Sequence, residues 1–250
     1  MAKSGIPSLT IFFPAYNDAP SLPRLVEQTF ATAADVTEDL EVVVVNDGSH
    51  DRTDQVLGEL CARFGPRLRV VRHAVNQGYG GAVRAGFRAA SKDYVFYTDA
   101  DGQYDVTELP RLVKALRPGI GLVNGYKTSR SDVFYRVWIG KIYLWSVRRL
   151  FRLSIRDVDC DFRLVKRSLL NDIPLESTSG TVCVELVRRL QDTGCGIVEV
   201  PVRHLPRAHG KSQFFRPMNL IRSIWELIGF YHQLQHSKKC AAAEVACDVE

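Results

Sequence analysis

Short apolar runs alternate with amphipathic stretches along the first half of the chain. The runs are rich in β-branched and aromatic residues and end in polar turns, as buried strands do. They predict strands at Leu9–Phe13, Leu40–Val45, Leu68–Arg72, Tyr94–Thr98 and Ile120–Asn124. Between them, apolar residues at helical spacing predict helices near Leu22–Phe30, Val56–Leu60, Gly80–Ala90 and Thr107–Leu116. This alternation predicts an α/β domain with a mostly parallel, helix-flanked sheet.

The second half of the chain alternates less regularly. Its pattern predicts helices at Val137–Phe151, Thr181–Gln191 and Asn219–Leu234, and strands at Phe162–Val165 and Gly196–Val202. We assign residues 1–216 to one domain, 217–236 to an amphipathic C-terminal helix and 237–250 to a disordered tail. Trp225 and Tyr231 of that helix suit the boundary between water and lipid. Its apolar face therefore predicts a peripheral membrane contact, or packing on the domain or on a membrane partner subunit.

Three of the predicted strands end in turns that contain an aspartate, namely Asp18, Asp47 and Asp99. The carboxyl ends of parallel strands lie at one edge of a sheet, where open α/β sheets bind their ligands. The three turns therefore predict one acidic, polar rim at that edge, and we expect the ligand site there.

The run that begins at Tyr94 ends abruptly in Asp99, Asp101 and Asp105, with Gln103 between them. Asp-x-Asp offers two hard oxygen ligands, which suit Mg²⁺ or Mn²⁺ held mainly through a substrate's phosphates. An isolated motif of this kind is more often a solvated acidic turn. An EF-hand loop is a poor match, because the positions that need glycine and glutamate hold Tyr104 and Pro110.

Charge is spread unevenly along the chain, which has a formal net charge of +5. Between residues 127 and 156, Asp132 is the single acid among eight basic residues: Lys127, Arg130, Arg136, Lys141, Arg148, Arg149, Arg152 and Arg156. Such a block favours an anionic partner, either phosphate groups or a charged membrane surface. A solvated helix face has the same composition. Nucleic-acid binding has only the net charge in its favour, and we predict none.

The cysteines and the N-terminus indicate the compartment. The six cysteines form no CxxC pair and no zinc-like spacing with histidine. The first residues, MAKSGIPSL, lack the apolar core of a signal peptide, and no run of about 18 apolar residues follows. We therefore expect a cytoplasmic protein with reduced thiols, whose membrane contact would be peripheral and on the cytoplasmic face.

Three further segments offer chemistry of their own. The glycines of NQGYGGAVRAG (Asn76–Gly86) predict close helix–sheet packing or close approach of the backbone to a ligand. The acids of DVDCD (Asp157–Asp161) cap a strand, form a salt-bridge cluster or belong to the ligand edge. The loop that contains Arg207, His209 and Lys211 has a composition suited to gripping a diphosphate, although many surface loops share it.

Together these motifs resemble the inverting family 2 glycosyltransferases with the GT-A fold, and most of all the dolichol- or polyprenyl-phosphate sugar transferases. The resemblance covers about Leu9 to Phe215, and the order and spacing of its motifs make it highly specific. The motifs are PAYND (Pro14–Asp18), VVNDGSHDRT (Val44–Thr53), NQGYGGAVRAG (Asn76–Gly86), DADGQYD (Asp99–Asp105), DVDCDFRL (Asp157–Leu164) and EVPVRHLPRAHGKSQF (Glu199–Phe214).

The resemblance implies a role for each matching residue. The nucleotide pocket would be lined by Pro14, Tyr16, Asp18 and Asp47. Asp99 would lie near the ribose or the ion, and Asp101 and Gln103 would hold Mg²⁺ or Mn²⁺ on the donor diphosphate. Arg207, His209 and Lys211 would close over that diphosphate. Asp157 matches the family's site aspartate, as a base or a positioning group, so Asp157 and Asp99 are the candidate catalytic residues.

Two departures from the family pattern stand out. The family often has glutamate where Asp18 stands and aspartate where Asn46 stands. Many relatives also carry C-terminal transmembrane helices, and no such segment is present here. The second departure leaves the lipid acceptor as an expectation to be tested.

The implied reaction moves a sugar from a GDP- or UDP-sugar to an acceptor phosphate. Such a phosphate is largely a dianion at neutral pH, so it needs positioning and cations more than a base. Lys127, Arg130 and Arg136 are the candidate acceptor-binding residues. The alternative is a related transferase with a soluble hydroxyl acceptor, which would need a carboxylate such as Asp157 as its base. A catalytically silent nucleotide-sugar-binding subunit conflicts with the intact DxD segment.

Overall fold

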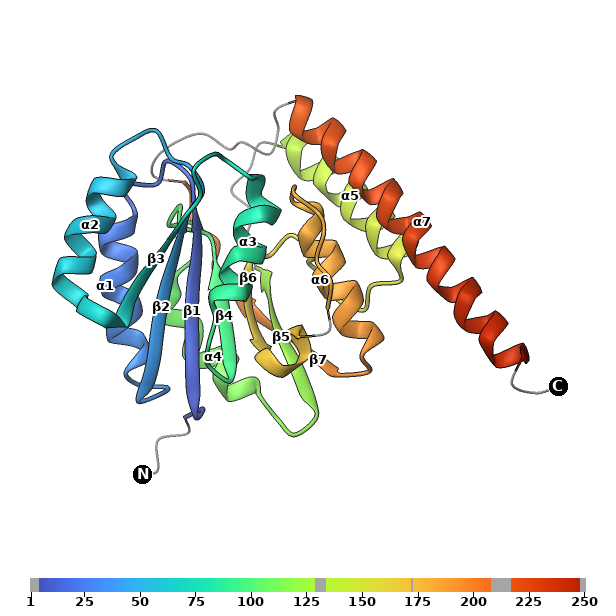
Figure 1. The fold of residues 1–250 in the computed structure, drawn as a ribbon, viewed down its shortest axis with the longest axis horizontal. Helices are drawn as coiled ribbons and strands as arrows, with labels where there is room; N and C mark the ends of the chain where they lie inside the picture. The colour runs from blue at the N-terminus through green and yellow to red at the C-terminus, as the bar shows by residue number, and fades with distance from the viewer. Residues whose placement is uncertain (1–4, 129–133, 172, 208–216, 248–250) are drawn as a thin grey trace.

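The computed structural model describes residues 5–128, 134–171, 173–207 and 217–247. A seven-stranded sheet in the order β3-β2-β1-β4-β6-β5-β7 lies between two layers of helices (Figure 1). Its strands are β1 (Ser8–Ala15), β2 (Asp39–Asn46), β3 (Leu68–Arg72), β4 (Tyr94–Thr98), β5 (Ile120–Lys127), β6 (Phe162–Lys166) and β7 (Gly196–Val202). Neighbouring strands run parallel except at β6, which is antiparallel to both β4 and β5. The predicted mostly parallel α/β sheet is confirmed.

The helices divide between the two faces of the sheet. They are α1 (Leu22–Ala33), α2 (Thr53–Phe64), α3 (Gly78–Ala89), α4 (Leu109–Ala115), α5 (Phe134–Phe151), α6 (Thr181–Asp192) and α7 (Pro217–Cys247), with short 3-10 turns η1 (Gly65–Arg67), η2 (Val106–Glu108) and η3 (Arg167–Leu170). Buried residues of α1, α2 and α4 belong to one hydrophobic core, and those of α3, α5, α6 and α7 to the other. No described helix is long and apolar enough to cross a membrane.

Strand β1 shows why the central strands read as continuous apolar runs. Ile11 and Phe13 enter the α1/α2/α4 core, whereas Phe12 enters the core on the opposite face. Both faces of a strand between two helical layers are buried, so alternation disappears. Helix α3 approaches this strand so closely that a Cβ on Gly86 would lie 2.2 Å from the ring of Phe12. The close helix–sheet packing predicted from the NQGYGGAVRAG glycines is confirmed.

Helix α7 differs from the predicted C-terminal helix in its length. It continues to Cys247 and so covers most of the segment 237–250 that we predicted to be disordered. The residues from Ala241 to Ala246 are rich in alanine, which has the highest helix propensity, and this explains the extension. Figure 1 shows α7 leaving the body of the molecule at this end.

Glu41 ties the opposite, amino-terminal edge of the sheet together. Its carboxylate is 7% exposed and accepts hydrogen bonds from Thr10 Oγ1 (2.9 Å), Ser91 N (3.2 Å) and Ser91 Oγ (2.9 Å), and it pairs with Arg69. Burial alone raises the pKa of Glu41, but these hydrogen bonds outweigh burial and lower the pKa below its ordinary value. A lowered pKa contributes stability above the unfolded-state pKa, and that stability is lost as the pH falls through the folded-state pKa.

We expect Glu41→Gln to reduce the free energy of unfolding by about 1–3 kcal/mol at pH 7, because the variant leaves buried donors poorly matched. The difference between wild type and variant should shrink at acidic pH, where the wild-type carboxylate also becomes protonated. Urea unfolding at several pH values measures both effects. Glu38→Gln, at an exposed position nearby, is the control; an equal loss there would contradict this role for Glu41.

Candidate functional site

The turns that follow β1, β2 and β4 meet at the carboxyl edge of the sheet, as the sequence predicts. Asn17 N donates to Ser49 Oγ (3.0 Å), which joins the first turn to the second. Ser21 Oγ donates to the carbonyl of Ala100 (2.5 Å), which joins the first turn to the DxD segment. The structure therefore places Asp18, Asp47 and the DxD acids on one rim.

Asp18 folds back on its own turn. Its Oδ2 accepts a hydrogen bond from Tyr16 N (2.9 Å). Burial raises the pKa of Asp18 to about 6 against this hydrogen bond, and the charge of Asp101 adds to the rise. The carboxylates of Asp18 and Asp101 are therefore close enough to interact electrostatically.

Asp47 is buried beneath the segment that leads into α3. Its Oδ1 lies 2.6 Å from His73 Nδ1 and accepts a hydrogen bond from Gln77 N (2.9 Å). Asn76 Nδ2 donates to its carbonyl (3.1 Å). Asp47 therefore fixes the start of α3 against the end of β2, in addition to the nucleotide contact that the resemblance implies.

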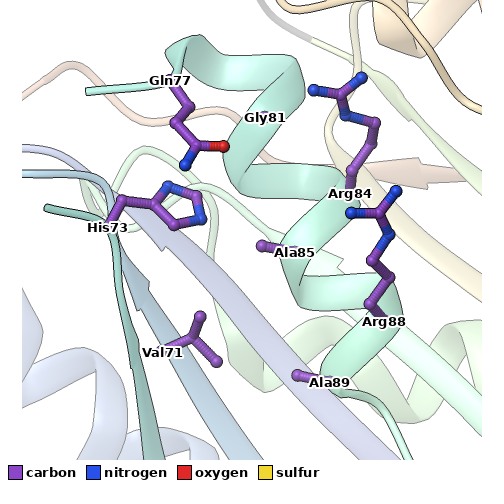
Figure 2. Close-up of a pocket in the computed structure, with 8 residues that line it drawn as sticks. All are labelled: Val71, His73, Gln77, Gly81, Arg84, Ala85, Arg88 and Ala89. Atoms are coloured by element: carbon purple, nitrogen blue, oxygen red, sulfur yellow. The ribbon is translucent and has the colours of Figure 1, made fainter. Parts of the chain in front are cut away.

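A surface cavity of about 430 Å³ lies beside this contact, between β3 and α3. Figure 2 shows His73 and Gln77 on one side of it and the guanidinium groups of Arg84 and Arg88 side by side on α3. Neither Asp47 nor any acid of the DxD segment lines this cavity. It therefore borders the rim and is separate from the predicted donor site.

Asp99 receives a hydrogen bond from the hydroxyl of Tyr79 on α3 (2.9 Å). Burial, followed by the charges of Asp161 and Asp101, raises the pKa of Asp99 well above its ordinary value. Thr98 of β4 pairs with Phe162 of β6, so Asp99 and Asp161 are the next neighbours across this antiparallel ladder. Two adjacent carboxylates favour a cation or a hydrogen-bond donor between or beside them.

Asp101 and Gln103 converge on a single cation, the guanidinium of Arg207. Arg207 Nη2 pairs with Asp101 Oδ2, and Arg207 Nε donates to Gln103 Oε1 (3.2 Å). Gln103 N also donates to Asp101 Oδ1 (2.9 Å), which closes the turn. One carboxylate and one amide oxygen directed at one positive charge fit Mg²⁺ or Mn²⁺ whose other ligands come from substrate and water. The described ranges contain no group of three or more His, Cys, Asp or Glu that could bind a metal by itself.

Asp157 is buried, and its carboxylate is already hydrogen-bonded to the backbone. Its side chain accepts from Lys127 N (3.3 Å) and Asp159 N (3.3 Å), and the residue is 5% exposed. Lys127 Nζ donates to the carbonyl of Asp159 (2.7 Å), and the surrounding acids, Asp157 first, raise the pKa of Lys127 in spite of its burial. These contacts order the junction between the end of β5 and the DVDCD segment.

Of the remaining predicted site residues, Pro14, Tyr16 and Arg136 lie within the described ranges. Pro14 is buried in β1, and Tyr16 lies partly exposed at the rim. Arg136 lies on α5. Arg130, His209 and Lys211 lie outside the described residues.

The prediction from sequence missed Tyr79 and His73, which contact Asp99 and Asp47 directly. Tyr79 lies within the NQGYGGAVRAG motif, where we considered only the glycines. It also missed the setting of Asp161, whose carboxylate accepts from Cys183 Sγ (3.0 Å) and lies 3.5 Å from the fully buried Arg163. The signal that could have found Tyr79 was its hydroxyl-bearing side chain between Gly78 and Gly80, in a segment already predicted to pack closely.

The model of the family described as "Glycosyl transferase family 2" matches residues 10–173, which is more than half of the chain. The chain belongs to glycosyl transferase family 2. The family 2 match contains the three turns of the rim, the DxD segment and Asp157.

Two similar relatives carry the same name, undecaprenyl-phosphate 4-deoxy-4-formamido-L-arabinose transferase. The one from Aeromonas hydrophila is 29% identical over 91% of this chain and 69% of its own length. The one from Pseudomonas aeruginosa is 30% identical over 88% of this chain and 64% of its own length. The chain thus spans about two thirds of the length of the curated relatives it matches.

Solved structures share the fold. Glucosyl-3-phosphoglycerate synthase from Mycobacterium tuberculosis in complex with UDP superposes with a TM-score of 0.68 at 20% identity, covering 92% of this chain and 82% of that one. The same enzyme with Mn²⁺, UDP and glucosyl-3-phosphoglycerate gives a TM-score of 0.65 at 21% identity, covering 89% and 78%. These likenesses confirm the GT-A-type fold of this family 2 chain.

Proposed function

We propose that this chain is an inverting, metal-dependent glycosyltransferase that moves a sugar from a nucleotide-sugar donor to a polyprenyl phosphate. The observation that carries the proposal is the convergence of Asp101 and Gln103 on one cation, at the rim that also holds Asp18 and Asp99. The names of the undecaprenyl-phosphate relatives support the acceptor. Family membership supports the reaction class.

Mg²⁺ or Mn²⁺ held by Asp101 and Gln103, with Asp99 beside them, would supply positive charge to the departing nucleoside diphosphate. Arg207 is the protein's own cation at the same place. With Asp101 holding the ion, the guanidinium of Arg207 would contact the diphosphate through its fork of donors. His209 and Lys211 follow in the same loop and remain candidates for that contact.

The chemistry of the acceptor explains the setting of Asp157. A lipid phosphate dianion attacks the anomeric carbon without first losing a proton, so it needs no general base. Asp157 is already engaged with two backbone N–H groups, which suits a positioning role. We assign it to holding the end of β5, where Lys127 lies. Arg130 and Arg136 come after this strand in the sequence.

An exposed apolar surface on α5 and α7 supports peripheral contact with a membrane. Apart from Val75 and Leu205, all the large exposed hydrophobic residues among those described lie on these two helices: Ile142, Trp145, Leu150, Met218, Leu220, Ile221, Ile224, Trp225 and Ile228. The opposite side of α7 packs on the body, where Phe230 stacks on Phe151 of α5 (5.4 Å between ring centroids). Tyr231, which we predicted for the lipid boundary, contacts Phe151 on this inner side.

Basic residues accompany this surface, since α5 carries Arg148 and Arg149 and contains no acid. Tryptophan and basic side chains around an apolar face favour the interface of an anionic bilayer. We therefore propose a bilayer surface as the site of the reaction, with a membrane partner subunit as the competing occupant.

A donor screen tests the proposal. The chain should be heated with UDP and GDP and with a panel of their sugar conjugates, each with and without Mn²⁺. We expect one nucleotide to raise the melting temperature only with metal, and its conjugates to be slowly hydrolysed. No stabilisation by any nucleotide in the presence of Mn²⁺ or Mg²⁺ would contradict the proposed donor site.

A further inference from the structure

Two helices grip the loop at residues 176–179 with buried or partly buried carboxylates. Glu185 of α6 accepts from Glu176 N (3.1 Å) and Ser177 N (3.0 Å). Glu226 of α7 accepts from the N–H groups of Thr178 and Ser179, which continue the same backbone. Four successive N–H groups of one loop are thus held by two acids from different helices.

Glu226 makes the larger share of these contacts. It accepts from Thr178 N (3.0 Å), Thr178 Oγ1 (2.6 Å), Ser179 N (3.0 Å) and Ser179 Oγ (2.6 Å). Burial alone raises the pKa of Glu226, but these hydrogen bonds outweigh it and lower the pKa. The carboxylate is therefore charged at neutral pH, and hydrogen bonds to a charged acceptor are the strong ones.

The carbonyls of this loop press on the first turn of α3. Gly80 N donates to the carbonyl of Thr178 (2.9 Å). A Cβ on Gly80 would lie 2.2 Å from the carbonyl oxygen of Ser177, and one on Gly78 would lie 2.5 Å from that of Thr178. Only glycine permits so close an approach of backbone to backbone. The position of the loop therefore sets the position of this turn.

That turn reaches two acids of the proposed donor site. Gln77 N, just before α3, donates to Asp47 Oδ1 (2.9 Å), and the hydroxyl of Tyr79 donates to Asp99 Oδ1 (2.9 Å). An unbroken series of hydrogen bonds and close contacts thus runs from Glu226 through the loop and the first turn of α3 to Asp47 and Asp99.

We infer that Glu226 is a positioning residue for donor binding, acting from α7 through the loop at residues 176–179. The inference rests on the proposed function for the donor site itself. Small displacements of a group that orients a ligand have large effects on binding and rate. Helix α7 then has two roles: it positions the donor site through Glu226, and it contains much of the exposed apolar surface.

Glu226→Gln tests this, because it keeps the side-chain volume while replacing one acceptor oxygen by an NH₂ that faces donors. Calorimetric titration of the full chain with UDP and with GDP, in Mn²⁺, should show about 10-fold weaker binding of the preferred nucleotide. Glu176→Gln is the matched control: it is the same change in the same loop, on a side chain whose one hydrogen bond among the described residues comes from Gln233 on α7. It should leave the dissociation constant within about 2-fold of wild type.

Gly80→Ala displaces the same loop from the side of α3. If Glu226 acts through this contact, the double variant Gly80→Ala/Glu226→Gln should bind no more weakly than the worse single variant, because the effects of coupled residues do not add. Thr178→Val removes one of the four hydrogen bonds and should weaken binding about 3-fold, which keeps the test available if Glu226→Gln fails to fold.

Unchanged nucleotide affinity in Glu226→Gln or Thr178→Val, a loss equal to that of Glu176→Gln, or additive effects in the double variant would overturn the inference. In each of these cases the wild type still binds nucleotide, so the proposed function stands. A wild type that binds neither UDP nor GDP would overturn both.

Discussion

Replacing Asp101 by alanine should lower the rate of sugar transfer by at least about 100-fold while the chain keeps its fold. Among the described residues, Arg207 is the one long-range hydrogen-bond partner of this side chain, and it lies at the proposed ion position. Asp101 belongs to neither hydrophobic core. Removing it takes away an ion ligand and leaves the guanidinium facing Gln103 alone. Losses of about 10²–10³ are typical when a group that stabilises developing charge is removed. Initial rates over a titration of Mn²⁺ measure the effect.

Asp105→Ala is the control for this variant, because Asp105 lies in the same segment but pairs with Arg203 (2.6 Å) instead of Arg207. It should keep activity within about 5-fold of wild type, as expected for a partly exposed ion pair. Asp101→Ala activity near the wild-type rate at saturating Mn²⁺ or Mg²⁺ would show that Asp101 is not an ion ligand.

The second large effect concerns α7. Ile221→Glu combined with Trp225→Glu should reduce binding to anionic vesicles by at least about 10-fold. Both side chains are exposed, by 50% and 68%, so the free energy of unfolding should hardly change. Immersing a large apolar side chain in the interface contributes roughly 1.5–3 kcal/mol, and a glutamate is repelled by an anionic surface. Flotation at low salt, with circular dichroism on the same samples, measures both quantities.

Val75→Glu is the matched control. Val75 is 71% exposed and lies in the segment between β3 and α3, outside both α5 and α7 in the chain. It should float like wild type. If the wild type itself stays at the bottom of the gradient at low salt, the apolar surface belongs to a partner subunit instead of a bilayer.

Much of this fold follows from local patterns. Each apolar run of the first half is a strand, because two layers of helices bury both faces of the sheet. Local patterns could not predict the direction of β6. Its apolar run would look the same in either direction, and its pairing with β4 joins Tyr94 to Lys166, far apart in the chain. The extension of α7 was missed because a charged, alanine-rich tail resembles both disorder and helix.

The site shows the same division. The acids at the strand ends were predictable, because parallel strands bring their carboxyl ends to one edge. Their partners were not, since the contact between Arg207 and Asp101 spans 106 residues and the contact between Glu226 and Thr178 spans 48. For Asp157, the sequence motif indicated a site residue but left its role open. The two backbone N–H groups that its side chain accepts from favour a positioning role over proton transfer.

The identity of the acceptor tests the proposed function most directly. The chain should be incubated with its preferred nucleotide-sugar, Mn²⁺ and vesicles that contain either a polyprenyl phosphate or the corresponding polyprenol, with Asp101→Ala as the blank. We predict a lipid-linked sugar phosphate of inverted anomeric configuration from the phosphate alone, seen by mass spectrometry and NMR. Transfer to the polyprenol or to a soluble alcohol in preference to the phosphate would contradict the account and favour a hydroxyl acceptor.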